Sequence, residues 1–188
     1  MDWLTNYLKK NNVTRVAYIM DAVTPRLQKE PDYIFKNKKM LEDRGFDIDF
    51  ISLEETKYLG KRLEKAQAIY VTGGNTFYLL KAIRQSGFDK IISKLLDNGV
   101  IYIGESAGSY VACPTIAMAH WKHQDADTVG LNDLTALNLV PFLVTVHYKD
   151  EFEPIIRPKI DKCSYPVKIL TDNQLLLIEK GKERLIEL

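Results

Sequence analysis

A serine flanked by two glycines lies near the middle of the chain. Residues 104–108 read Gly-Glu-Ser-Ala-Gly, and they follow a short apolar run, Val-Ile-Tyr-Ile, at 100–103. Small residues compatible with a helix come next, so we expect the order strand, Gly-x-Ser-x-Gly, helix. A nucleophile elbow requires this order, because the glycines allow a sharp turn that lifts the Ser106 hydroxyl above the end of a sheet. The alternative is a glycine-rich turn with an incidental serine.

A serine nucleophile needs a base, and His147 is the candidate. It closes an apolar run, Leu-Val-Pro-Phe-Leu-Val-Thr-Val, that reads as a strand. A histidine at the carboxyl end of a strand, after the serine in the chain, suits the order of elbow hydrolases. Its imidazole titrates near neutrality, so it can take the serine proton and return it to a leaving amine. The alternative is a histidine at a strand end whose hydrogen bonds are only structural.

Two further features carry polar groups that could bind a ligand. His120 and His123 lie in a polar stretch with Asp125 and Asp127, but no helix or strand fixes their spacing, so we expect no metal site. A second glycine turn, Gly-Gly-Asn-Thr at 73–76, lacks the lysine of a P-loop and the third glycine of a dinucleotide fingerprint.

That second turn fits an oxyanion hole better than a phosphate cradle. The backbone amides of Gly74 and Ala107 are the two expected donors to the oxyanion. Asn75 is a candidate N-cap for the helix that follows.

The elements that must position these residues alternate along the chain. Helices are expected at 2–11, 31–44, 54–65, 76–84, 88–96 and 107–112, with at best a short one at 150–160. Strands are expected at 13–20, 46–53, 68–72, 100–103 and 139–147. The last residues predict a small β meander, with strands at 167–170, 174–179 and 183–188 around the turns Asp172-Asn173 and Lys180-Gly181.

This alternation predicts an α/β fold with a mainly parallel sheet and helices on both faces. Ligands in such folds lie beyond the carboxyl ends of the strands. The loops expected there are 21–25, 73–76, 104–108 and the segment past His147, so both glycine turns belong on one rim.

Composition limits the classes of function. The 188 residues carry a formal net charge of +1, which gives no case for nucleic acid or an acidic membrane as a partner. No apolar run approaches the roughly 20 residues that span a bilayer, and the first residues do not have the order of a signal peptide. Two cysteines, Cys113 and Cys163, follow neither a disulfide framework nor a metal spacing. We therefore expect a cytoplasmic protein of one domain, 1–188. We also expect no cofactor.

Four motifs occur in order along the chain: Gly-Gly-Asn-Thr-Phe at 73–77, the elbow at 104–108, Ala-Cys-Pro-Thr-Ile at 112–116 and Ala-Leu-Asn-Leu-Val-Pro-Phe at 136–142. Together they resemble peptidase family S51, whose members include the aspartyl dipeptidase peptidase E and, more distantly, cyanophycinase. The resemblance implies a class I glutamine-amidotransferase-like fold with serine at the elbow. It further implies Ser106 as nucleophile, His147 as base, and Gly74 and Ala107 as oxyanion donors. Peptidase E hydrolyses dipeptides with an N-terminal aspartate and needs no metal.

The resemblance leaves the third catalytic residue to be found. The acid of the family falls after the elbow helix, where an ungapped match places Trp121 at the aspartate of peptidase E. Asp125 is the candidate that we favour over Asp127, and some relatives use glutamate instead. The first strand typical of the family is absent from the sequence. This implies a different sheet edge or an exposed apolar groove, with a homodimer or low stability as outcomes.

Three residues are candidates for contact with a substrate. The resemblance gives Arg157 as the only arginine in the shortened segment that in peptidase E binds the substrate aspartate. Glu105, beside the nucleophile, is a candidate pocket residue whose charge would repel an acidic substrate, and Asn75 lies at the other glycine turn.

The sequence therefore predicts a serine peptidase, a dipeptidase-like enzyme that acts on short peptides, with Asp-X dipeptides as candidate substrates. An esterase or amidase on the same elbow, and a catalytically weak binding protein that kept the motif, are the alternatives.

Overall fold

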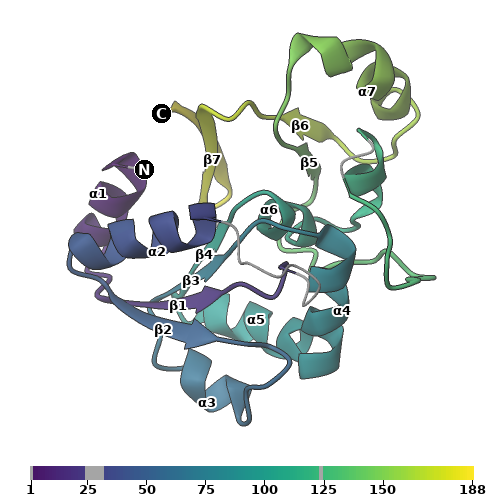
Figure 1. Cartoon of the computed structure of the whole chain (residues 1–188). Helices are drawn as coiled ribbons and strands as arrows, with labels where there is room; N and C mark the ends of the chain where they lie inside the picture. The colour runs from purple at the N-terminus through teal and green to yellow at the C-terminus, as the bar shows by residue number, and fades with distance from the viewer. Residues whose placement is uncertain (1, 24–31, 123–124) are drawn as a thin grey trace.

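Four parallel strands form the central sheet, in the order β2-β1-β3-β4. They are β1 (Arg15–Ile19), β2 (Asp47–Ile51), β3 (Ala68–Val71) and β4 (Ile101–Gly104). The computed structural model describes residues 2–23, 32–122 and 125–188 (Figure 1). All four residues of β3 are buried, as expected for a central strand that is covered on both faces. The expected loop at 21–25 is therefore described only as far as residue 23, and the expected helix at 31–44 only from residue 32.

Helices cover both faces of this sheet (Figure 1). One face packs against α1 (Asp2–Lys10) and α2 (Asp32–Asp43), with Leu4, Leu8, Ile34 and Leu41 buried against Val16, Tyr18 and Tyr70. The other packs against α3 (Leu59–Leu63), α4 (Thr76–Ser86) and α5 (Phe88–Asp97). The two apolar clusters follow from the strand period of two, because Val16 and Tyr18 face one side and Ala17 and Ile19 the other. The predicted α/β fold with helices on both faces is confirmed.

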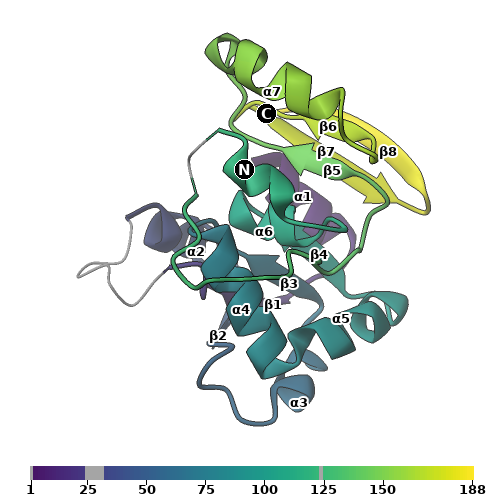
Figure 2. The same ribbon diagram turned by 90° about the vertical axis from the view of Figure 1, so that its right-hand side faces the viewer.

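The second half of the chain adds a smaller layer (Figure 2). After β4 come α6 (Ala107–Val111), the 3₁₀ turn η1 (Ala117–His120) and β5 (Leu143–Thr145). Then follow η2 (Asp150–Phe152), α7 (Glu153–Ile160), β6 (Val167–Ile169), β7 (Gln174–Glu179) and β8 (Lys182–Glu187). β5 pairs in parallel with β6, whereas β7 and β8 form an antiparallel hairpin. Figure 2 shows these strands together on one side of the central sheet.

Two predicted elements differ from the structure in this region. The strand expected at 139–147 is only three residues long, because the amides of Asn138 and Leu139 bond to the carbonyls of Cys113 and Ala112 rather than to a strand. The predicted meander of three terminal strands is wrong for its first strand. That strand, β6, pairs with β5, and only β7 and β8 form a hairpin. In the first half of the chain, α3 is also shorter than the helix predicted at 54–65, since it covers only Leu59–Leu63.

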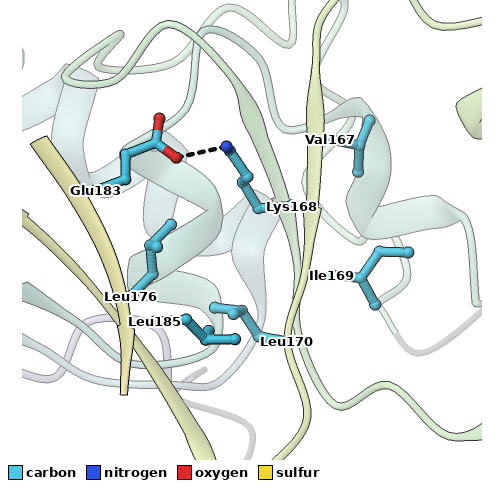
Figure 3. Close-up of a pocket in the computed structure, with 7 residues that line it drawn as sticks. All are labelled: Val167, Lys168, Ile169, Leu170, Leu176, Glu183 and Leu185. Atoms are coloured by element: carbon cyan, nitrogen blue, oxygen red, sulfur yellow. Dashed lines mark ion pairs between the residues drawn. The ribbon is translucent and has the colours of Figure 1, made fainter.

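A shallow pocket of about 430 Å³ lies between β6 and the hairpin (Figure 3). Leu170, Leu176 and Leu185 form its apolar part, and an ion pair between Lys168 and Glu183 closes one side. None of the residues discussed above as candidates for chemistry lines it. Within the part of the chain that the structure describes, no helix is long and apolar enough to cross a membrane.

Candidate active site

Ser106 occupies a sharp turn between β4 and α6. Its backbone angles are φ 50° and ψ −108°, a conformation that a residue with a side chain rarely adopts and that is typical of strained functional turns. Two hydrogen bonds brace the turn: Ser109 Oγ donates to the Gly104 carbonyl at 2.7 Å, and the Tyr102 hydroxyl donates to the Gly108 carbonyl at 2.7 Å. The strand-turn-helix order expected from the sequence is therefore present.

Glycine is required at the elbow because two backbones nearly touch there. A Cβ on Gly108 would lie 2.2 Å from the Val71 carbonyl oxygen, which belongs to β3. This close approach seats the elbow helix directly on the neighbouring strand. The second glycine turn is equally confined, since a Cβ on Gly74 would lie 2.4 Å from the Ala22 carbonyl oxygen.

His147 lies beside the serine. Its Nε2 is 2.9 Å from Ser106 Oγ, so the serine hydroxyl can donate to the ring. The residue follows β5 with φ 57°, which turns the ring back over the elbow. The pair therefore has the geometry in which a histidine accepts a proton from a serine.

The carboxylate behind the histidine is Asp172. The distance from His147 Nδ1 to Asp172 Oδ1 is 2.5 Å, and the two side chains are 43% and 64% exposed, so the pair lies open to solvent. A carboxylate at Nδ1 fixes the tautomer in which Nε2 is free to accept from serine. The structure thus places Ser106, His147 and Asp172 in one continuous chain of hydrogen bonds.

Strand pairing brings Asp172 to the ring. β5 and β6 run parallel, and the Leu170 amide donates to Thr145 while the Tyr148 amide donates to Leu170. His147 and Asp172 each follow the carboxyl end of one of these neighbouring strands. Sequence reasoning read Asp172 as a turn residue and missed it. The parallel pairing of the two strands places both ends at one edge, and no local pattern in the sequence reveals that pairing.

The acid expected from the sequence was Asp125, and the structure corrects this. Asp125 Oδ2 accepts from the Thr76 amide at 3.1 Å and from the Thr76 hydroxyl, at the start of α4. Its carboxylate is therefore engaged at a helix N-terminus, where a negative charge is stabilised, and the His147 ring is bonded to Asp172 instead. Asp127, the second choice, accepts from the amides of residues 129, 130 and 131 within its own loop.

Asn75 forms the N-cap of α4, as its position after the glycine turn predicted. Its Oδ1 accepts from the Tyr78 amide at 2.9 Å, and its Nδ2 donates to the Ala126 carbonyl at 2.9 Å. Both polar ends of the side chain are thus used within the protein. Its backbone amide donates to Ala22 at 2.7 Å, which anchors the turn that carries Gly74.

Glu105 is turned toward α2 and β3. Its carboxylate accepts from Asn37 Nδ2 at 2.9 Å and from the Tyr70 hydroxyl at 3.2 Å. Burial raises the pKa of this carboxyl above its usual value, although these two bonds and the Gly73 amide lower it. The residue predicted as a pocket carboxylate therefore ties the elbow to its neighbours, and sequence reasoning gave no sign of Asn37 or Tyr70.

Arg157 lies on α7 and is engaged with a neighbour. Its Nε donates to Glu153 Oε1 at 2.7 Å, one helical turn away, and its side chain is 51% exposed. No hydrogen bond or ion pair joins it to Ser106, His147 or Asp172 among the residues that the structure describes.

The remaining histidines do not gather into a site in the described residues. His120 is exposed and packs against Phe77, with ring centroids 4.4 Å apart, and His123 lies outside the described residues. Over residues 2–23, 32–122 and 125–188, no group of three or more His, Cys, Asp or Glu side chains is placed to hold a metal ion. The buried Cys113 is held as a thiol, because burial raises its pKa to about 12.

Comparison with known proteins agrees with this elbow and its fold. The family model of peptidase family S51 matches residues 1–186. The chain belongs to peptidase family S51. An uncharacterized peptidase of Listeria monocytogenes is 39% identical over 177 residues, which cover 89% of this S51 peptidase and 83% of that relative. Peptidase E of Nostoc sp. is 35% identical over 145 residues, or 77% of this chain and 56% of its own length.

A solved structure has the same fold. It is the crystal structure of a protein from Listeria monocytogenes that is described as a candidate peptidase E. This S51 peptidase aligns with it at a TM-score of 0.79 and 31% identity, over 93% of this chain and 86% of the other. The resemblance that the motifs indicated is thereby confirmed at the level of family and fold.

Proposed function

We propose that this S51 peptidase is a serine peptidase that cleaves short peptides, with Ser106 as nucleophile, His147 as base and Asp172 as the supporting acid. The single observation that carries the proposal is the continuous chain of hydrogen bonds from Ser106 Oγ through the His147 ring to Asp172. This is the constellation in which a serine loses its proton to a histidine as it attacks a carbonyl carbon.

The first half of the proposed reaction forms an acyl-enzyme. Ser106 Oγ bonds to the scissile carbonyl carbon while its proton passes to His147 Nε2. The carbon–nitrogen bond then breaks, and the imidazolium gives that proton to the leaving amine. Asp172 at Nδ1 stabilises the positive ring during this step.

The second half releases the product. A water molecule gives a proton to His147 as its oxygen bonds to the acyl carbon, the bond to Ser106 breaks, and the proton returns to the serine oxygen. We assign the backbone amides of Gly74 and Ala107 to the oxyanion in both halves. Ala107 is the first residue of α6, where an amide has no partner within the helix.

Short peptides are proposed as substrates because the family resemblance implies a dipeptidase. Asp-X dipeptides are the first to test on that ground. The Arg157 guanidinium is already paired through Nε with Glu153, so Glu-X and neutral dipeptides belong in the same panel.

Labelling with a fluorophosphonate tests the nucleophile. The wild-type protein is expected to be labelled, Ser106→Ala is expected to lose the label, and Ser164→Ala, which changes an exposed serine, is expected to keep it. Labelling that persists in Ser106→Ala contradicts the proposal. Hydrolysis of the dipeptide panel then tests the substrate class, and turnover of aryl esters alone would favour the esterase alternative.

A further inference from the structure

Lys122 is a buried cation whose partner is a backbone carbonyl. Only 7% of the residue is exposed, and its Nζ donates to the carbonyl oxygen of Val146. The ammonium also lies 5.5 Å from the centre of the Phe152 ring. Burying an ammonium is costly unless it makes strong contacts, so a lysine in this position calls for a reason.

The carbonyl that accepts this bond belongs to the peptide unit that enters His147. That histidine has φ 57°, a conformation that non-glycine residues seldom adopt and that its surroundings must hold in place. Rotation of the peptide plane between Val146 and His147 would change this angle and move the ring away from Ser106. The Lys122 bond to the Val146 carbonyl oxygen restrains that plane.

The positive charge of Lys122 also lies near the groups that hold the His147 ring. Asp172 and Asp125 are the two carboxylates whose fields reach the ammonium, and Asp172 is the one that bonds the His147 ring. No ion pair of Lys122 with either is present among the described residues. The attraction between Lys122 and Asp172 therefore operates across a gap.

We propose that Lys122 is a positioning residue for His147: its ammonium holds the Val146 carbonyl, and so the imidazole, in the orientation that meets Ser106 and Asp172. The inference rests on the function proposed above, and it adds a residue outside the serine, histidine and acid. Lys122 touches no reacting atom and acts only through the backbone and the field at the ring.

The test measures the rate of Ser106 labelling by a fluorophosphonate as a function of pH. Lys122→Met, which keeps much of the stem but removes the donor and the charge, is expected to slow labelling by about tenfold or more through misplacement of the base. Its pH midpoint for labelling is expected to rise, because the variant lacks the positive charge near the hydrogen-bonded chain of Ser106, His147 and Asp172. Lys122→Arg is expected to restore the wild-type midpoint and most of the rate.

Lys159→Met is the matched control. Lys159 Nζ donates to the Trp121 carbonyl at 3.0 Å, so it too anchors this segment through a backbone oxygen, but among the described residues it has no hydrogen bond to β5 or to the peptide that enters His147. We expect Lys159→Met to keep both rate and midpoint. If it matches Lys122→Met, or if Lys122→Met keeps the wild-type rate and midpoint, the inference is wrong.

Two further outcomes are separable. If the wild-type protein takes no label at all, the proposed function itself fails and the inference with it. If Lys122→Met does not fold, Lys122→Gln keeps a neutral donor without the charge, and it is expected to show the raised midpoint with a smaller loss of rate. A wild-type midpoint in a folded Lys122→Gln variant overturns the electrostatic half of the inference.

Discussion

At the scale of single residues, two aspartates divide the roles that the sequence assigned to one. Asp172 is 64% exposed and bonds the His147 ring, whereas Asp125 is half-buried and bonds Thr76 at the start of α4. The assignment of Asp172 rests on its hydrogen-bond distance to the His147 ring and not on burial.

Replacement of each aspartate by asparagine separates these roles. We expect Asp172→Asn to lower Ser106 reactivity by about a hundredfold, because the ring loses its tautomer and its partner. Asp125→Asn is expected to keep the reactivity but to lower the free energy of unfolding by about 1 kcal/mol, from the weakened bond at the helix start. Labelling rates and urea unfolding measure the two effects, and equal loss of labelling in both variants would reject the assignment.

Site residues could be predicted from the sequence where the pattern that marks them lies in neighbouring positions of the chain. The serine was visible because its glycines and flanking elements are contiguous, and the histidine because it closes an apolar run. The hydrogen bond between them is present as expected, and their catalytic roles stay predictions. Asp172 was not found, because it reaches His147 only through the pairing of β5 with β6. The two residues are 25 positions apart, and no periodic pattern in the sequence indicates that pairing. Lys122 was equally invisible, because only the fold reveals that it is buried.

At the scale of elements, the elbow depends on how closely α6 approaches β3. The contact between Gly108 and the Val71 carbonyl leaves no room for a side chain. An exchange of glycine for alanine in a helix ordinarily stabilises a protein, because glycine has the greater entropy to lose. At this position the steric clash should reverse the sign.

Two glycine variants test that reversal. Gly108→Ala is expected to lower the free energy of unfolding by about 1–3 kcal/mol, as overpacking does, and to abolish labelling of Ser106. Gly60→Ala is the control, because Gly60 lies in α3 with open space around it, and it is expected to raise the free energy of unfolding by about 0.5–1 kcal/mol. Thermal or urea unfolding measures both. A stabilised Gly108→Ala variant would contradict the described packing.

Elements with strong periodicity were predicted well, and those defined by pairing were not. The alternation of strands and helices through residue 111 gave the parallel sheet, since it depends on local apolar patterns. The smaller layer differed because β5 and β6 are only three residues long and stabilise each other through a contact distant in sequence. The local sequence of a strand does not show whether it pairs with the next strand along the chain or with one made earlier.

At the scale of the whole molecule, charges of both signs are buried near the carboxyl ends of the strands. Burial raises the pKa of Asp21, which accepts from the Leu53 amide, and that of Glu105, and it lowers the pKa of Lys122 to about 8. Each of these groups is harder to charge in the folded protein than in the unfolded chain. The contribution of Asp21 and Glu105 to stability should therefore fall as rising pH ionises them, and that of Lys122 should rise at alkaline pH.

The alkaline rise can be measured. The folded-state pKa of Lys122 lies at about 8 and its usual value is 10.5, so between these pH values the unfolded chain binds more protons and stability rises with pH. The free energy of unfolding of the wild-type protein is expected to rise relative to that of Lys122→Met across this window. Urea unfolding at several pH values measures the difference. Lys162→Met, which removes an exposed lysine, is expected to give a constant difference, and a constant difference in Lys122→Met would contradict the burial described here.

The order in which the three residues of the hydrogen-bonded chain occur has a consequence during synthesis. The ribosome releases the serine first, the histidine about 40 residues later, and Asp172 last, at about 5–20 residues each second. Under the proposed function, a nascent chain that has already folded its central sheet still lacks the carboxylate that orients the base. The complete chain of hydrogen bonds therefore forms only after β6 has been made and has paired with β5.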